Sequence, residues 1–208
     1  MTSLRREDVE RTFNVSRETM ARLDIHVALL KKWSPKINLV SKDTLEQVWH
    51  RHIADSAQLW SIQPLTKGLW LDLGSGAGFP GLVIAAFATD HPGTEFRLIE
   101  SDARKCAFLQ SVIREADLPA HVVTERIEAL PPQSADVISA RALTSLTNLL
   151  EMTEKHRKPD GIGLFHKGRT VHKEVEEAQE SWRFNPRLHR SLTDPNAAIV
   201  EIGDLDRV

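Results

Sequence analysis

A short apolar run followed by closely spaced glycines constrains this chain more than any other segment. Residues 69–81 read Leu-Trp-Leu-Asp-Leu-Gly-Ser-Gly-Ala-Gly-Phe-Pro-Gly. The run predicts a buried strand, and a helix is expected from Pro80 because proline suits the first helical turn. The glycines let the backbone turn tightly and let a ligand lie against bare main chain. A strand, a glycine turn and a helix in this order are typical of a nucleotide-type cofactor site.

The glycines fit two competing motifs. Gly76, Gly78 and Gly81 spell G-x-G-x-x-G, the dinucleotide fingerprint, with Glu100 about 20 residues further on to bind a ribose. This motif predicts a nucleotide-binding oxidoreductase. Apart from the two motifs, the glycines could also form a turn that binds no ligand.

The second register starts at Asp72 and continues through Gly74, Gly76 and Gly78 as D-x-G-x-G-x-G, which resembles motif I of S-adenosylmethionine (SAM) methyltransferases. We favour it because a carboxylate at the end of a strand can meet the ammonium of a methionine moiety, directly or through water. An anionic pyrophosphate would gain nothing from that charge. Glu100 serves equally well as the acceptor for the ribose of SAM.

The composition fits one enzyme domain with an extension. A chain of 208 residues buries an ample core. The single cysteine, Cys106, excludes an internal disulfide and indicates a reducing compartment, and no long apolar span is present. We therefore expect a cytoplasmic protein that works as a monomer. The net charge of −2 gives no general attraction to nucleic acid, so any RNA contact must come from local patches.

Residues 1–68 are predicted to be helical. One helix starts at a Ser16 cap and is closed by Pro35; another opens with the capping-box pair Asp43 and Glu46 and runs to about Trp60. We interpret this part as a helical extension packed on the remaining domain.

Strands and helices alternate through residues 69–208. The later apolar runs that predict strands lie at Phe96–Ile99, His121–Val123, Asp136–Ser139 and Gly161–Phe165. Helices are predicted at Ala103–Ala116 and from about Leu143, and the tail offers an edge hairpin built from Trp182–Phe184 and Ala197–Ile202. This alternation indicates an α/β fold with a Rossmann-like, doubly wound, mostly parallel seven-stranded sheet.

Motifs along most of the chain resemble those of one family. They are Asn38-Leu39, Arg51-His52-Ile53-Ala54-Asp55-Ser56, Phe79-Pro80-Gly81, Leu98-Ile99-Glu100-Ser101, Lys105 with Phe108-Leu109, Arg126-Ile127-Glu128, Ser139-Ala140-Arg141-Ala142 and Lys167-Gly168. The chain resembles the RsmG (GidB) family, bacterial class I SAM methyltransferases that methylate guanine N7 in 16S ribosomal RNA. The resemblance implies SAM as cofactor and 16S rRNA, the small ribosomal subunit or its precursor as partner.

The predicted cofactor-binding residues are Asp72, Gly74, Gly76, Gly78, Phe79, Glu100, Ile127, Glu128 and Arg141. Ile127 and Glu128 follow the third strand, where the adenine is usually held. The candidates for positioning the substrate are Arg51, His52, Asp55, Arg141 and Lys167. A basic and aromatic patch is suited to phosphate contact and stacking: Trp182, Arg183, Phe184, Arg187, His189 and Arg190.

The Arg-His-x-x-Asp-Ser motif has two interpretations. On a regular helix the side chains of four residues share one arc: Arg51, His52, Asp55 and Ser56. Either Arg51 and Asp55 form an ion pair on a solvated helix face, or the residues form a network that lines a cleft. The resemblance favours the network, which would order the N-terminal helices against the cofactor domain. A metal set including His50 is disfavoured because His50 and His52 point apart.

The chemistry expected of a guanine N7 methyltransferase fits this set of residues. Cys106 lies inside a predicted helix and is expected in the core, so a cysteine nucleophile is not indicated. The N7 lone pair lies in the ring plane and needs no deprotonation, so transfer depends on proximity and orientation. A SAM methyltransferase for another substrate and a non-catalytic RNA-binding factor remain the alternatives.

Overall fold

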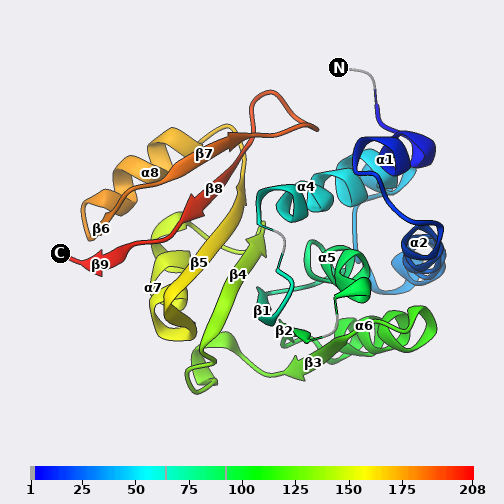
Figure 1. Ribbon diagram of the computed structural model, residues 1–208, viewed down its shortest axis with the longest axis horizontal. Helices are drawn as coiled ribbons and strands as arrows, with labels where there is room; N and C mark the ends of the chain where they lie inside the picture. The colour runs from blue at the N-terminus through cyan, green and yellow to red at the C-terminus, as the bar shows by residue number, and fades with distance from the viewer. Residues whose placement is uncertain (1–2, 64, 92) are drawn as a thin grey trace.

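A seven-stranded sheet forms the centre of the molecule in a computed structural model that describes residues 3–63, 65–91 and 93–208 (Figure 1). The strand order is β3-β2-β1-β4-β5-β8-β7. Strands β1 to β5 are parallel, and β8 runs antiparallel to both of its neighbours. The bounds of the strands are β1 (Gly68–Leu73), β2 (Thr94–Glu100), β3 (Ala120–Thr124), β4 (Ala135–Arg141), β5 (Arg157–Lys167), β7 (Arg187–Arg190) and β8 (Ala198–Ile202). The predicted fold class is confirmed.

Both faces of the sheet are buried because successive strand residues point to opposite sides. Trp70 belongs to the apolar core on one face, whereas Leu71 belongs to the core on the other. The first core packs against α5 (Gly81–Phe87) and α6 (Ala103–Ala116), and the second against α7 (Leu146–His156) and α8 (Val171–Gln179) (Figure 1). The two layers of helices leave the carboxyl ends of β1, β4 and β5 available for a ligand.

The N-terminal helices share the first core with α5 and α6. They are α1 (Arg6–Thr12), α2 (Arg17–Ile37), α3 (Lys42–Glu46), the π-helical η1 (Trp49–Ala54) and α4 (Asp55–Ile62). The division at residue 68 stays a prediction. None of the helices in the described ranges is long and apolar enough to cross a membrane.

Two expected helix boundaries in this part are wrong. Ser16 caps α2 as predicted, by accepting a hydrogen bond from the Thr19 amide at 3.1 Å. The helix nevertheless continues past Pro35 to Ile37, and its C-cap Asn38 adopts a left-handed φ of 50° that asparagine tolerates. Proline in the last turn removes one hydrogen bond, and packing of α2 against α5 and α6 outweighs that loss.

The predicted helix from the Asp43 capping box to Trp60 is also interrupted. Ser41 caps α3, and the chain then forms the wider π-helical turn η1 before α4 begins at Asp55. Such π-turns occur often at functional sites. Here the turn lies in the Arg-His-x-x-Asp-Ser motif, so the arc expected for a regular helix does not describe its side chains.

Both strands predicted for the edge hairpin form, but they do not pair with each other. β8 pairs with β7, whereas β6 (Trp182–Phe184) pairs with β9 (Leu205–Arg207) in a separate two-stranded sheet. Trp182 and Phe184 bury their rings in the second core, which fixes β6 beside α8 instead of at the sheet edge. Pairing between short strands is a long-range choice that local sequence does not encode.

Candidate active site

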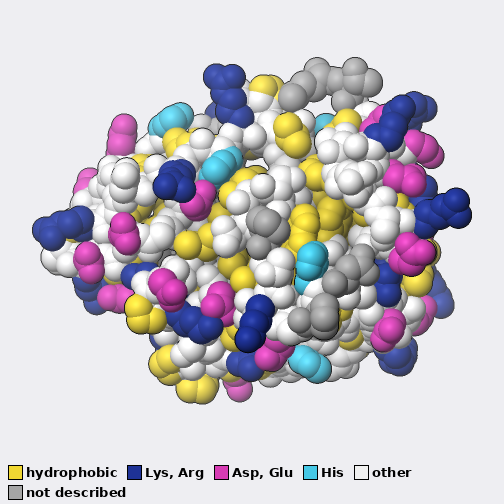
Figure 2. Space-filling view, in the orientation of Figure 1, with side chains coloured by type: hydrophobic (Ala, Val, Ile, Leu, Met, Phe, Trp, Pro, Cys, Tyr) yellow, Lys and Arg dark blue, Asp and Glu magenta, His cyan; other side chains and the backbone are white. Residues whose placement is uncertain are grey.

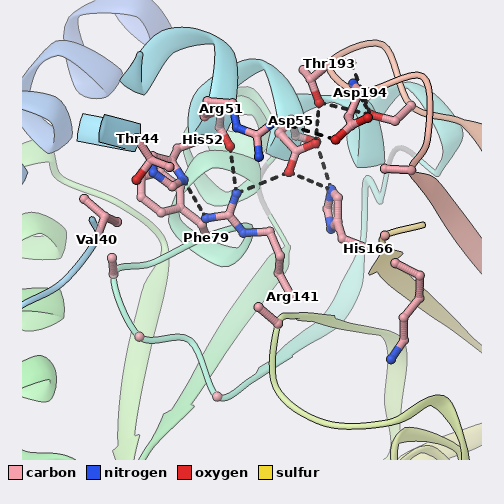
Figure 3. A pocket seen from close by; sticks show the side chains of 18 of the residues that line it. Val40, Thr44, Arg51, His52, Asp55, Phe79, Arg141, His166, Thr193 and Asp194 are labelled. Carbon is pink, nitrogen blue, oxygen red and sulfur yellow. Dashed lines mark hydrogen bonds and ion pairs between the residues drawn. The ribbon is translucent and has the colours of Figure 1, made fainter. Parts of the chain in front are cut away.

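A cavity of about 660 Å³ lies where the carboxyl ends of β1, β4 and β5 face the N-terminal helices (Figure 3). Its walls come from the glycine loop after β1, residues 39–44, η1, and the β7–β8 connection at residues 191–197. This volume is typical of a site for a small molecule. The cavity therefore brings together segments that are far apart in the sequence.

The glycine loop presents bare backbone to this cavity. Gly74, Gly76 and Gly78 all have left-handed φ values, 63°, 55° and 84°. A Cβ on Gly74 would lie 2.6 Å from Leu143 Cδ1, and one on Gly78 would clash with Leu82, so both glycines face protein. A Cβ on Gly76 would meet nothing nearer than the Gly74 carbonyl oxygen at 3.7 Å, and Gly76 lines the cavity. The loop thus has the form of a cradle for a ligand.

Asp72 lies beneath the loop and is 1 % exposed. Its carboxylate accepts hydrogen bonds from the Ser139 hydroxyl at 2.6 Å and the Gly81 amide at 3.3 Å. Burial raises the pKa of Asp72 to about 6, although these hydrogen bonds favour the ionised form. Asp72 joins the strand ends to the start of α5; its contact with a cofactor ammonium stays a prediction.

Glu100 holds the loop from the side of β2. One of its carboxylate oxygens accepts from the Gly76 amide at 2.9 Å, and the other from the amides of Ser101 and Asp102 at 2.8 Å each. Ile127 is buried and Glu128 is exposed, both after β3 and away from the residues that line the cavity. The predicted contacts of Glu100 with the ribose, and of Ile127 and Glu128 with the adenine, remain predictions.

Arg141, the last residue of β4, is the centre of a network in the cavity wall. Its Nη1 donates to the Arg51 carbonyl at 3.1 Å and to Asp55 Oδ2 at 3.2 Å, and its Nη2 donates to His52 Nδ1 at 2.9 Å. The guanidinium also lies 5.0 Å from the centre of the Phe79 ring. Four of the predicted positioning residues therefore meet, and Asp55 pairs with Arg141 instead of forming a solvated pair with Arg51.

Three stacked rings connect this network to α2. Phe79 lies between His26 and His52, with ring centroids 4.8 Å apart on each side. Burial lowers the pKa of His26 to about 4, and burial together with the Arg141 charge lowers that of His52 to about 3. Both imidazoles are therefore neutral at pH 7. His26 Nε2 bonds to the Ala77 carbonyl at 2.9 Å and so anchors the glycine loop on α2.

Asp55 also holds the far wall of the cavity. Its Oδ1 accepts from the Thr193 hydroxyl at 2.7 Å, and its backbone carbonyl accepts from His166 Nε2 at 2.9 Å. Burial alone would raise the pKa of Asp55, but the cationic neighbours and the Thr193 hydroxyl hold it below its usual value. The charge of Arg141 is therefore paired within the cavity wall.

Comparison with known proteins identifies the family. Residues 19–198 match the family model described as GidB, rRNA small subunit methyltransferase G. The chain belongs to this family. A ribosomal RNA small subunit methyltransferase G from Ruegeria pomeroyi is 50% identical over 199 residues, 95% of this chain and 97% of the relative. One from Cereibacter sphaeroides is 47% identical over 195 residues, covering 93% and 94%. The resemblance recognised in the sequence is confirmed.

Solved structures support the fold. A SAM-dependent methyltransferase from Aquifex aeolicus superposes with a TM-score of 0.57 at 15% identity, covering 81% of this chain and 95% of that one. A SAM-dependent O-methyltransferase from Thermotoga maritima gives 0.58 at 12% identity, covering 74% and 66%. At such identities the likeness concerns the fold alone.

The remaining sequence candidates lie in different surroundings from those expected. Lys167 lines the cavity, but its side chain is 7 % exposed and its Nζ donates to Glu174 at 2.7 Å, so its charge is already paired. The predicted stacking patch is wrong in its aromatic members, because Trp182 and Phe184 are buried. Among its basic members, Arg187 pairs with Glu201 at 3.3 Å.

His50 and Cys106 both have structural surroundings. His50 Nδ1 accepts a hydrogen bond from the Leu4 amide at 3.2 Å, away from the network around His52. Cys106 is buried in α6 with its sulfur 3.2 Å from the Glu100 carbonyl oxygen. It lies in the core as predicted for a structural cysteine.

Sequence reasoning missed His26, His166, Thr193 and Asp194. A lone histidine on an apolar helix face is indistinguishable from a core residue, and His26 lies 51 residues from its partner Ala77. Thr193 lies 138 residues from Asp55, so no local pattern links them. The spacing of the motif at residues 51–56 was the one sequence feature that pointed to this wall of the cavity. The residues that bind the motif became evident only in the structure.

Proposed function

We propose that this protein transfers a methyl group from SAM to N7 of a guanosine in the 16S rRNA of the bacterial small ribosomal subunit. The observation that carries the proposal is the single cavity shared by the glycine cradle and the Arg141–Asp55–His52 network. Membership of the small subunit rRNA methyltransferase G family supports the substrate.

The cavity residues fit the cofactor. When bound, SAM supplies a methyl group carried on a positively charged sulfur. Gly76 offers open space beside bare backbone, and Asp72 and Glu100 hold the loop from two sides. Asp55 pairs the charge of Arg141 and so reduces its repulsion of a cationic ligand. Phe79 gives the cavity an apolar surface between two neutral imidazoles.

The acceptor side needs orientation more than proton transfer. Guanine N7 carries its lone pair in the ring plane, so the wall around Arg141 has to hold the base in line with the methyl group. The stacked rings of His26, Phe79 and His52 and the bonds from Asp55 to Arg141 and Thr193 make this wall rigid. Side chains fixed by several partners lose little freedom when a base enters.

Local cations are proposed to bind the RNA. Basic and acidic side chains alternate over the face shown in Figure 2, in keeping with the net charge of −2. Arg190 is exposed next to Ser191, which lines the cavity, and Arg183 is exposed on β6; both are the proposed phosphate contacts, with help from the N-terminal helices. We propose that the protein acts as a monomer in the bacterial cytoplasm, on free rRNA, a precursor or the assembled subunit.

A methyl-transfer assay tests the proposal. Purified protein is incubated with SAM labelled in its methyl group and with 16S rRNA or small subunits, and the RNA is digested to nucleosides. We expect the label in 7-methylguanosine. The variant Gly76→Val should lose the signal, whereas Gly203→Val, where a Cβ meets nothing within 4 Å, should retain it. Label in another nucleoside would indicate a different substrate atom, and SAM binding without transfer would indicate a binding protein.

A further inference from the structure

We propose that the Asp194 carboxylate binds the Watson–Crick edge of the target guanine and so selects guanine over adenine. The inference rests on the proposed function, because it assigns the acceptor base to the same cavity. Asp194 lies in the β7–β8 connection and lines the cavity together with Gly76 and Arg141 (Figure 3).

The connection that carries Asp194 is fixed at two neighbouring residues. The Thr193 hydroxyl donates to Asp55 at 2.7 Å, and the Leu192 amide donates to Gln58 Oε1 at 2.6 Å. A carboxylate on such a loop has a defined position relative to the Arg141 network. A side chain that recognises one base over another needs a position fixed in this way.

Asp194 has acceptor capacity that the other cavity carboxylates have already used. Asp55 binds Arg141 and Thr193, and Glu174 accepts from Lys167 Nζ, the Leu146 amide and Thr170.

Asp194 Oδ1 accepts from the Asn196 amide at 2.9 Å. Its Oδ2 forms an ion pair with Arg51 Nη1 at 3.8 Å, which is longer than a hydrogen bond and open to solvent, because the two side chains are 38 % and 43 % exposed. Among the carboxylates that line the cavity in the described part of the chain, Asp194 is therefore the one with an oxygen that accepts no hydrogen bond and can turn from a solvent-exposed ion pair to a ligand.

The chemistry of guanine matches such a group. N7 and O6 lie on one edge of the base, and N1–H and the N2 amino group lie on the opposite edge, so a donor pair faces away from the methyl group. Two parallel N–H donors suit a carboxylate, which accepts through both oxygens. Adenine has an unprotonated N1 at the equivalent position and would set a lone pair against the carboxylate. A site built to bind a polar edge rejects a base that lacks it.

The same carboxylate would favour the reaction. As the N7–methyl bond forms, the methyl–sulfur bond breaks, its electron pair stays on sulfur, and the positive charge passes to the purine. N1–H and the N2 amino group then become stronger donors, so their bonds to Asp194 strengthen on the way to the product. An interaction that strengthens in the transition state accelerates the step.

A cycle of protein and base changes tests this inference. The methylated guanosine is mapped with the wild type and then replaced by inosine, which lacks the N2 amino group. We expect inosine to lower kcat/KM of the wild type roughly tenfold or more. Asp194→Asn should lower kcat/KM on guanosine by about ten- to a hundredfold and should make the inosine penalty small. The binding constant for RNA without cofactor should follow the same pattern, while affinity for S-adenosylhomocysteine stays unchanged.

The matched control is Asp160→Asn, an exposed carboxylate at the start of β5, away from the cavity. It should behave as the wild type on both bases. An inosine penalty that is equal in wild type and Asp194→Asn would overturn the inference, as would a loss of cofactor affinity that explains the activity. If the wild type places no methyl group on guanosine, the proposed function itself fails, so the two failures are distinct.

Discussion

Replacing Asp72 with asparagine should separate the stability of the fold from cofactor binding. The pKa of the buried Asp72 is about 6, against an ordinary value of 3.8, so the carboxyl group is mostly ionised at pH 7 in a site that disfavours the charge. A shift of this size corresponds to roughly 3 kcal/mol of lost stability at pH 7, at about 1.4 kcal/mol per pKa unit. The neutral amide of Asp72→Asn would remove that penalty.

The direction of each pKa shift determines how that group's contribution to the free energy of unfolding changes with pH. Because the folded pKa of Asp72 is raised, its stabilising contribution is complete below about pH 4 and is lost as the pH rises through 6. His26 and His52 act in the opposite direction: their pKa values are lowered to about 4 and 3, so the stability they contribute is present above about pH 6.5 and is lost as the pH falls. Both proteins contain the two histidines, so their contribution cancels in the difference between the free energies of unfolding of the wild type and Asp72→Asn. That difference reports on Asp72 alone.

We therefore expect the difference in the free energy of unfolding to change by roughly 2 kcal/mol between pH 7 and pH 4, in favour of the wild type at low pH. At pH 7 the variant also loses a hydrogen bond, because the side-chain NH₂ of asparagine faces another donor, either the Gly81 amide or the Ser139 hydroxyl. This loss costs about 1–3 kcal/mol. The two proteins should thus have similar stabilities there. Urea unfolding across this pH range measures the difference.

Cofactor binding supplies the second half of this prediction. Calorimetry at pH 7 should show that Asp72→Asn binds SAM roughly tenfold more weakly or worse, because the variant loses a charge and one of the two hydrogen bonds that join Asp72 to Gly81 and Ser139. A difference in stability that does not vary with pH would refute the burial argument. Unchanged SAM affinity would refute the assignment of Asp72 to the cofactor site.

Three further predictions concern the cofactor and the RNA. S-adenosylhomocysteine should raise the melting temperature and NAD should not, because only a ligand of the native state stabilises it; stabilisation by NAD alone would reverse the choice of motif. Gly76→Val should lose some stability, because valine is strained at a φ of 55°, but should still unfold cooperatively and should fail to bind SAM in calorimetry below its melting temperature. Gly78→Val should be less stable still, because its side chain also meets Leu82; normal binding by Gly76→Val would place the cofactor elsewhere. Arg190→Ala should flatten the slope of log K against log salt for RNA binding by roughly 0.7–0.9. Lys167→Ala should lower stability with little change in this slope, because Lys167 is paired with Glu174. A flatter slope for Lys167→Ala and an unchanged one for Arg190→Ala would make Lys167 the phosphate contact.

The parts of this molecule that were predictable follow from local patterns. The strand–glycine–helix unit at residues 69–81 and the alternation of strands and helices depend on nearest neighbours in sequence. The grouping of Arg51, His52 and Asp55 was likewise visible as a motif. Their common partner Arg141 was predicted to lie in the cofactor pocket because it follows β4, and it lines the cavity.

The parts that were not predictable depend on tertiary context. The π-helical turn at η1 has no signal in its sequence, and it lies where the Arg141 side chain donates to the Arg51 carbonyl from the end of β4. The choice of β9 as the partner of β6 depends on burying Trp182 in a core made by α7 and α8. The same holds for Thr193 and Asp194, whose position is fixed by residues more than one hundred positions away.

The most direct test of the central claim replaces one atom of the substrate. 16S rRNA in which the methylated guanosine is exchanged for 7-deazaguanosine keeps the Watson–Crick edge and the shape of the base but carries no lone pair at position 7. With SAM labelled in its methyl group, we predict that transfer to this RNA is lost while its binding to the protein is unchanged. Continued transfer at the same nucleotide would contradict methylation of guanine N7.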